Sequence, residues 1–294
     1  MTEFVQALVL SLLVGGIYAL VASGLTLIFG VMRVINIAHG AFLILGAFIT
    51  YTVWNQLGLD PMVGVVITTP IVFGLGWLVY RLMVRPIRHA PMSSTVLLTF
   101  GLALVVEGVM GLVWGNDSTS IRPSYVDQSF HIGDVFIPKA QVYGGLLAVV
   151  VLVALWLILT KTWLGRAIRA AAANPASAEL VGIKVTSVAA LVFGLGLAAA
   201  GAGGGITGVL YPFVPGSHYL WIARLLAIVV LGGLGSLEGA VLSALVFGIA
   251  ETMTAVYISP AWATAVPYAI VFVVLLFRPQ GLLGTRLRDD AVTA

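Results

Sequence analysis

Long apolar stretches separated by short polar segments run through the whole chain. They fall at about 4–29, 35–54, 61–83, 93–114, 141–160, 187–210, 222–233, 237–257 and 261–277. Most are close to the ~20 residues that an α-helix needs to cross ~30 Å of hydrocarbon, whereas a membrane β-barrel shows alternating segments of ~10 residues. The pattern predicts an all-α fold: a polytopic transmembrane helical bundle in which residues 1–294 form a single domain.

Two of these stretches are irregular. The stretch 222–233 is short, and 30–40, "GVMRVINIAHG", is polar in the middle of an apolar run. Apolar segments interrupted by glycine often mark broken or re-entrant helices that line a binding route. We expect one broken element near 31–54. If this segment crosses the membrane, the chain has nine spans and an external N-terminus; if it returns to its own side, there are eight spans and an internal N-terminus.

Basic residues orient the spans, because cytoplasmic loops of membrane proteins are rich in Lys and Arg. They cluster in three segments: Arg81, Arg85 and Arg88; Lys161, Arg166, Arg169 and Lys184; and Arg278, Arg286 and Arg288. We therefore place the loop 161–186 and the tail 278–294 in the cytoplasm. The loop 115–140 carries more acidic than basic residues and is predicted to face outward.

Composition agrees with a membrane protein. The chain has 294 residues, of which 61% are hydrophobic and only 9% are charged, whereas soluble domains carry about 25% charged residues. The net charge of +3 reflects the cytoplasmic loops and does not indicate nucleic acid as a partner. The absence of cysteine excludes disulfides and thiolate chemistry.

A glycine-rich motif, "GGGITG" at 203–208, matches the G-x-G-x-x-G dinucleotide fingerprint. That fingerprint requires a preceding strand, and here the motif lies inside an apolar run. Small residues at a spacing of four let membrane helices approach closely, so we predict helix packing at Gly201, Gly204, Gly205 and Gly208.

Enzyme chemistry is not indicated by any motif. The chain has no P-loop signature for phosphate, and its four histidines are scattered without metal-ligand spacing. We therefore expect no cofactor, no metal and no catalytic residue, and any ATP hydrolysis would belong to partner subunits.

Several polar side chains lie inside or beside the apolar runs, namely Glu107, Arg224, Glu238 and Glu251. A charge at the bilayer centre costs roughly 2.5–3.5 kcal/mol, so such residues usually face a cavity or a partner. They either line a pathway or fix helix contacts. Together with the polar interruption, they give four candidate pathway residues: Asn36, His39, Glu107 and Glu238.

The polar stretch "RAIRAAAANPASAELVGIKV", 166–185, is a small structure between two apolar runs. Residues 164–173 favour a helix, which Asn174 ends because the residue before proline avoids the α region. Asn174 and Pro175 are also a good N-cap and first residue for a second helix, and Gly182 suits the left-handed position after its end. Such a short helix at 175–181 needs a surface to pack on; otherwise the segment is a loop folded against its own protein.

Four blocks of the sequence resemble one family across nearly the whole chain. The blocks are "YALVASGLTLIFGVMRVINIAHGAF" (18–42), "GRAIRAAAANPASAELVGI" (165–183), "VLGGLGSLEGAVLSALVFGIAE" (230–251) and "FRPQGLLG" (277–284). They resemble the integral-membrane permease of branched-chain amino acid ABC importers, the LivH type.

The resemblance implies an importer permease in the bacterial cytoplasmic (inner) membrane. It implies a second permease subunit (a paralogue or a second copy), two cytoplasmic ATPase subunits and an extracytoplasmic solute-binding protein. In such importers a cytoplasmic loop of the permease docks in a groove on the ATPase. Carried over by position, this coupling element is formed by Arg166, Arg169, Ala173, Asn174, Ala178, Glu179, Leu180 and Gly182.

The sequence departs from the family pattern at three positions near the expected pathway. Ala41 stands where an acidic residue is frequent, Glu238 where proline is common, and Glu107 where an amide is frequent. The solute therefore stays open between small hydrophobic amino acids and the urea, short amides or aromatic acids that related permeases carry. An ion-coupled secondary transporter is the other alternative, and it would need no helix at 175–181.

Overall fold

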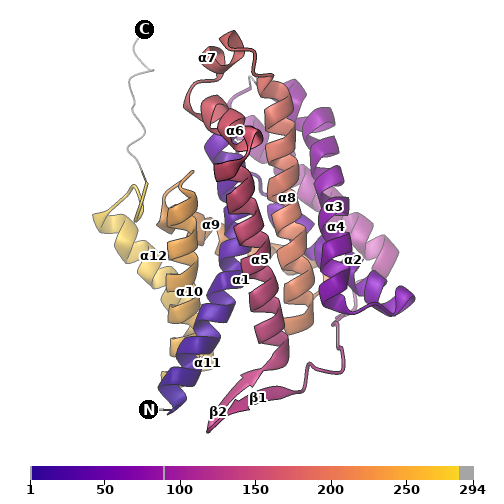
Figure 1. Cartoon of the computed structure of the whole chain (residues 1–294), viewed down its shortest axis with the longest axis vertical. Helices are drawn as coiled ribbons and strands as arrows, with labels where there is room; N and C mark the ends of the chain where they lie inside the picture. The colour runs from indigo at the N-terminus through magenta and orange to yellow at the C-terminus, as the bar shows by residue number, and fades with distance from the viewer. Residues whose placement is uncertain (1, 89, 285–294) are drawn as a thin grey trace.

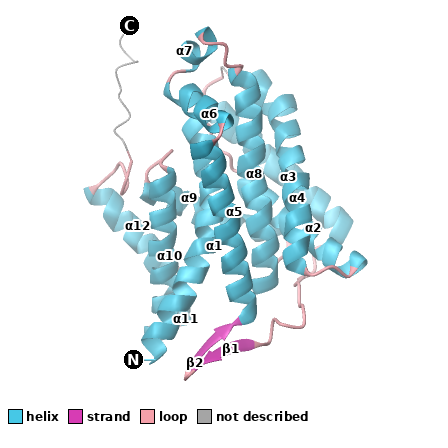
Figure 2. Ribbon diagram, in the orientation of Figure 1, coloured by secondary structure: helices cyan, strands magenta, loops and turns pink. Residues whose placement is uncertain are grey.

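The computed structural model describes residues 2–88 and 90–284, and most of these residues are helical (Figure 2). The predicted tail is therefore described only to residue 284, and Arg286 and Arg288 lie outside the described residues. The long helices are α1 (Thr2–Met32), α2 (His39–Leu57), α3 (Pro61–Val79), α4 (Met92–Trp114), α5 (Lys139–Lys161), α8 (Val185–Leu210), α9 (His218–Gly232), α10 (Leu237–Tyr257) and α12 (Ala265–Phe277).

Shorter elements join these helices. They are a π-helical turn (Tyr80–Val84), 3-10 turns (Arg85–Ile87 and Pro215–Ser217), β1 (Ser129–Ile132), β2 (Val135–Pro138), α6 (Trp163–Ala173), α7 (Pro175–Leu180) and α11 (Pro260–Ala263).

The bundle has a hairpin end, which carries β1 and β2, and an α7 end opposite to it (Figure 1). Nine helical segments within 2–88 and 90–284 are long and apolar enough to cross a membrane. The start of α1 reaches the hairpin, where the Phe136 N–H donates to Gln6 Oε1 at 3.4 Å. The turn between α2 and α3 lies at the same end, because the Tyr125 hydroxyl donates to the Asp60 carboxylate at 3.3 Å. Segment 31–54 therefore crosses, so nine spans are confirmed and the eight-span alternative is wrong.

Burial, and after it the neighbouring Asp60, raises the pKa of Tyr125. The hydroxyl therefore keeps its proton at neutral pH, and its hydrogen bond holds the loop 115–138 against the turn between α2 and α3.

The hairpin is a small departure from the predicted all-α fold. Antiparallel β1 and β2 pair Ile132 with Val135 around Gly133 and Asp134, and Gly133 has a φ of 61°. Two-residue turns that contain glycine at a positive φ match the twist of paired strands. The sequence carried this signal in the loop 115–140, for which no strand was predicted.

Helix α8 forms the centre of the bundle, and 72% of its most apolar 18-residue segment is buried inside the protein. Lipid tails give apolar helices no hydrophobic reason to associate, so close packing of small residues has to hold them together. A methyl group on Gly201 would lie 2.7 Å from Val72 of α3. Methyl groups on Gly204, Gly205 and Gly208 would meet Leu43, Thr50 and Phe213, respectively. The "GGGITG" motif thus lies within a helix at its most crowded contacts.

The polar stretch at the α7 end forms the two short helices that the sequence predicts. Asn174 Oδ1 accepts a hydrogen bond from the Ser177 N–H at 3.0 Å and caps α7. Gly182 follows with a φ of 84°, in the left-handed region that glycine tolerates. The helix ends at Leu180, one residue earlier than expected.

Because the chain contains no cysteine, single cysteines test this topology directly. Leu59→Cys and Asp117→Cys should react with a membrane-impermeant maleimide from one side of the membrane, and Ala176→Cys only from the other. Both ends of α2 lying on one side would place Leu59→Cys with Ala176→Cys, and that labelling pattern would contradict the nine-span structure.

Candidate functional site

The first interruption of the helices is the segment 33–38 between α1 and α2. Arg33 has a φ of 53°, which ends α1. A hydroxyl of α4 then supports the unwound backbone: Thr99 Oγ1 accepts from the Ile37 N–H at 3.2 Å and donates to the Ile35 carbonyl at 3.2 Å. Non-helical backbone at membrane depth persists only where it is buried in protein or faces water, and here distant side chains bury and satisfy it.

Asn36 and His39, both predicted pathway residues, lie in and just after this segment and are fully buried. His39 is the first residue of α2, and its Nε2 lies 3.1 Å from the Val21 carbonyl, in the body of α1. Helix α2 therefore begins within the bundle. Among the described residues, neither side-chain polar atom of Asn36 has a hydrogen-bond partner, and His39 Nδ1 has none either.

The second interruption, 211–217, precedes α9. Its backbone is supported by the outer loop: the Thr119 N–H donates to the Phe213 carbonyl at 2.9 Å and the Phe213 N–H donates to the Thr119 carbonyl at 2.8 Å. The Val214 N–H donates to Ser217 Oγ at 3.0 Å. Helix α9 thus also starts inside the bundle, and the outer loop folds back to hold that start.

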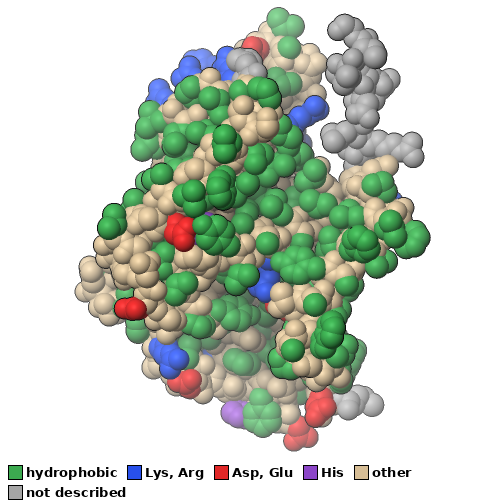
Figure 3. All heavy atoms as spheres, turned by 180° about the vertical axis from the view of Figure 1, so that it is seen from behind, with side chains coloured by type: hydrophobic (Ala, Val, Ile, Leu, Met, Phe, Trp, Pro, Cys, Tyr) green, Lys and Arg blue, Asp and Glu red, His purple; other side chains and the backbone are tan. Residues whose placement is uncertain are grey.

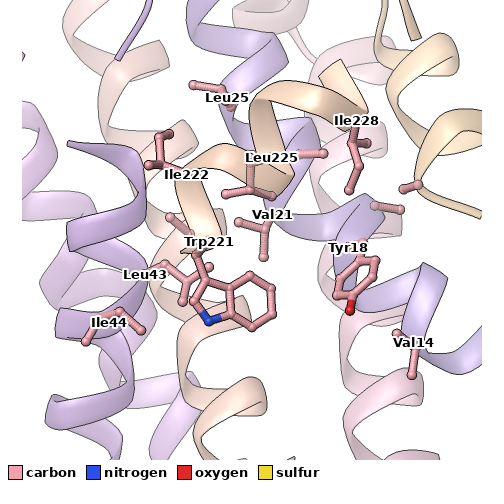
Figure 4. Close-up of a cluster of buried hydrophobic side chains, with 14 of the residues drawn as sticks. Val14, Tyr18, Val21, Leu25, Leu43, Ile44, Trp221, Ile222, Leu225 and Ile228 are labelled. Carbon is pink, nitrogen blue, oxygen red and sulfur yellow. The ribbon is translucent and has the colours of Figure 1, made fainter. Parts of the chain in front are cut away.

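The two interrupted helices meet at their first turns. A methyl group on Gly40 of α2 would lie 2.7 Å from the carbonyl oxygen of His218, the first residue of α9. We call this contact the α2–α9 junction. Leu43 and Ile44 of α2 flank Trp221 and Ile222 of α9 just beyond it (Figure 4). Helix N-termini carry partial positive charge and free N–H groups, so their meeting makes a polar point inside an apolar bundle.

Glu107, another predicted pathway residue, lies beside this junction. Its Oε2 is 3.0 Å from His218 Nε2 and accepts from the Tyr219 hydroxyl at 2.9 Å. The histidine side chain is 1% exposed, whereas the carboxylate is 28% exposed. Glu107 is therefore held from one side and open on the other. The sequence placed Glu107 but gave no sign of His218 or Tyr219, which lie 111 and 112 positions away.

A second charged group lies further along α9. Arg224 Nη2 lies 2.8 Å from Glu251 Oε1 of α10, Arg224 Nη1 donates to the Tyr18 hydroxyl at 2.9 Å, and Tyr18 donates to Glu251 Oε2 at 2.7 Å. The guanidinium also lies over the rings of Tyr18 and Trp221. Both charged side chains are about one-fifth exposed, at 20% and 19%. The sequence singled out these charges but not their pairing.

Glu238, the fourth predicted pathway residue, is not part of this arrangement. It is exposed in the first turn of α10, where Ser236 caps the helix by accepting from the Gly239 N–H at 3.1 Å. A carboxylate in the first turn complements the helix dipole. Its other surroundings are an apolar groove of about 410 Å³ between α5 and α10.

The residues expected to couple to an ATPase lie at the α7 end, where Lys and Arg side chains gather (Figure 3). Arg169 folds back to donate to the Leu159 carbonyl, while Arg166, Ala173, Asn174 and Glu179 are exposed. Ala178 is only 3% exposed and packs against its own chain. Leu180 and Val181, by contrast, are 88% and 76% exposed. The apolar surface that α7 presents is therefore Leu180–Val181.

Within residues 2–88 and 90–284, no group of three or more His, Asp and Glu side chains is placed to hold an ion.

Sequence comparison decides the family. Residues 7–275 match the family described as "Branched-chain amino acid transport system / permease component". The chain belongs to this family. It is 28% identical to the high-affinity branched-chain amino acid transport system permease protein LivH of Escherichia coli and 30% identical to BraD of Pseudomonas aeruginosa, each alignment covering 96% of both chains.

An archaeal relative, a probable branched-chain amino acid transport permease protein LivH of Methanocaldococcus jannaschii, is 27% identical over 93% of this permease and 90% of its own length. No solved structure matches the chain significantly. The family resemblance predicted from the four sequence blocks is thus confirmed: the chain is a multi-pass transport permease and not an enzyme.

The ion pair on α9 gives a stability prediction for this permease. Arg224→Met leaves the Glu251 carboxylate without its cation, which should cost about 1–3 kcal/mol and lower the unfolding temperature in detergent. The double variant Arg224→Met/Glu251→Gln should be more stable than the single Arg224→Met variant, because no unpaired charge remains. A double variant that is no more stable than Arg224→Met would contradict a direct pairing.

Proposed function

We propose that this chain is the transmembrane permease subunit of an ATP-driven importer for small amino acids of the branched-chain or hydrophobic class. The observation that carries the proposal is the α2–α9 junction, where two interrupted helices meet beside the half-open carboxylate of Glu107. Discontinuous helices whose N-termini meet inside a bundle are a recurrent way to hold a small solute in transporters.

The chemistry of the junction suits a zwitterion with an apolar side chain. The helix N-termini complement the solute carboxylate, and Glu107 complements its ammonium group, held in place by His218 and Tyr219. Leu43, Ile44 and Trp221 form buried apolar packing close by. Asn36 and His39 add buried polar atoms that have no hydrogen-bond partner within residues 2–88 and 90–284.

The assembly follows from the same proposal. The α7 end faces the cytoplasm of a bacterium, where the basic loops belong, and the hairpin end faces outward toward a solute-binding protein. A second permease subunit, either a paralogue or a second copy, completes the pathway, and two ATPase subunits bind at the α7 ends. Leu180 and Val181 are the side chains that dock, since both are large, apolar and strongly exposed at the end of α7.

Glu107→Gln tests the solute site. It removes the charge that would pair with the ammonium group and should lower kcat/KM for leucine uptake about tenfold or more. Glu238→Gln is the matched control, because it removes an exposed glutamate charge away from the junction; uptake should stay within about twofold of the wild type.

Two outcomes would count against an amino acid as the solute. Unchanged leucine uptake by Glu107→Gln would show that the Glu107 carboxylate does not contact the solute. Preferred uptake of urea, an amide or an aromatic acid over leucine would show that the chain has the substrate class of the related permeases. Uptake that an ionophore abolishes and ATP depletion spares would instead indicate a secondary transporter.

Leu180→Asp tests the docking residue. Burying an unpaired carboxylate costs several kcal/mol, which is comparable to the free energy of a modest interface, so ATPase subunits should no longer co-purify with the variant. Leu234→Asp makes the same change at another exposed leucine at the α7 end and should keep the ATPases bound. Ala178→Arg is a poor test, because it disrupts the packing of α7 on its own chain. Normal association and uptake by Leu180→Asp would show that α7 is only a loop.

A further inference from the structure

A polar cavity of about 220 Å³ opens between the end of α3 and the start of α8. It shares no residue with the α2–α9 junction. It is lined by Trp77, Tyr80, Arg81, Arg85, Thr186, Ser187 and Ala190. Neither the transport pathway nor the docking surface of α7 uses these residues. We propose that this cavity binds the phosphate headgroup of an anionic phospholipid.

The charge of the cavity calls for an anion. Arg81 and Arg85 are exposed at its wall, and neither has an Asp or Glu oxygen within 4 Å among the described residues. None of the described residues that line the cavity carries a carboxylate. Thr186 and Ser187, in the first turn of α8, line the same cavity as the two arginines, so hydroxyl groups and positive charge share this site.

The local backbone places these side chains. Helix α3 widens into a π-helical turn at Tyr80–Val84 and then tightens into a 3-10 turn at Arg85–Ile87. Such turns shift the helical phase and often lie at functional sites. Here the change of phase carries Arg81 and Arg85 to the rim while Tyr80 stays buried.

The position of the cavity selects a lipid over a soluble anion. It lies where the span 61–87 ends, the depth at which phosphates of the bilayer lie. Ile71, Leu75 and Leu78 of α3 are exposed toward the membrane just below it, so acyl chains have an apolar surface to follow. Trp77 lies between the two zones, as aromatic side chains do at membrane interfaces. Basic pockets between helices on the cytoplasmic side commonly take anionic headgroups.

The cavity also lies next to a second cavity beside α7. A neighbouring cavity of about 380 Å³ shares Tyr80 and Thr186 and is lined by Pro175, Ala176 and Glu179. Arg88 Nη1 donates to Thr186 Oγ1 at 3.2 Å and links the two walls. A headgroup bound in the first cavity would therefore lie beside Tyr80 and Thr186, which also line the cavity next to α7.

Native mass spectrometry of the purified full-length chain tests the proposal, with phosphatidylglycerol as the probe and phosphatidylcholine of the same acyl chains as the reference. The wild type should retain one phosphatidylglycerol in preference. Arg81→Gln/Arg85→Gln should weaken its retention about 30-fold. Lys161→Gln/Arg166→Gln removes the same charge at the same end but outside the cavity, and should change retention less than twofold.

Four results would overturn the proposal. An equal loss of lipid retention in both double variants would show that general surface charge, and not the cavity, binds the lipid. Unchanged retention in Arg81→Gln/Arg85→Gln would show that the cavity does not bind the lipid. Displacement of the lipid by equimolar glycerol phosphate would make the site one for a free anion. Loss of ATPase co-purification with lipid retention intact would assign the arginines to the partner subunit. The assay uses neither solute nor ATPase for the lipid measurement, so it can succeed where the proposed transport function fails. The lipid site rests on the proposed function in one respect only, which is that the lipid lies in the cytoplasmic leaflet.

Discussion

A backbone N–H or carbonyl without a partner costs several kcal/mol inside a bilayer, and this constraint shapes the permease where its helices stop short. The chain interrupts its helices at 33–38 and at 211–217. Each interruption is supported by a distant segment: Thr99 of α4 bonds the first, and Thr119 of the outer loop bonds the second. The first interruption is buried at Val34, Asn36 and Ala38, and the second is buried at Phe213 and Pro215 but exposed at Tyr211 and Pro212.

Close packing by small residues makes that burial work. Helix α8 can lie at the centre because its glycines admit the side chains and backbone of α2 and α3 at distances that a methyl group would prevent. A glycine also permits close packing at the α2–α9 junction, where Gly40 lets the first turns of two helices touch. Polar atoms then gather at the contact, with Glu107 half open beside it. A rigid, glycine-packed centre and a polar junction at its edge are what a small-solute pathway needs.

Much of this could be predicted from the sequence, for identifiable reasons. Apolar length fixed the spans, Arg33, Asn36 and His39 marked the break before α2, and Asn174, Pro175 and Gly182 marked α7, because each of these signals is local. The pairings could not be predicted. Tyr18 and Glu251 lie 233 positions apart, and one sequence holds no record of which distant residues meet. Glu238 stays a prediction as a pathway residue, and the structure places it in the exposed first turn of α10. The hairpin was missed although Gly133 and Asp134 signalled it.

The central claim is that α9 presents its exposed face to a water-filled pathway and not to lipid. Leu220 of α9 is 77% exposed and Val150 of α5 is 62% exposed, so burial alone does not distinguish them. In a chain without native cysteine, the rate at which a hydrophilic methanethiosulfonate reagent modifies Leu220→Cys and Val150→Cys in the assembled transporter measures hydration at each face. The account predicts rapid modification of Leu220→Cys, slowed by solute with its binding protein, and no modification of Val150→Cys. Equal resistance of both cysteines would mean that α9 faces lipid or a dry interface, and the pathway would have to lie elsewhere.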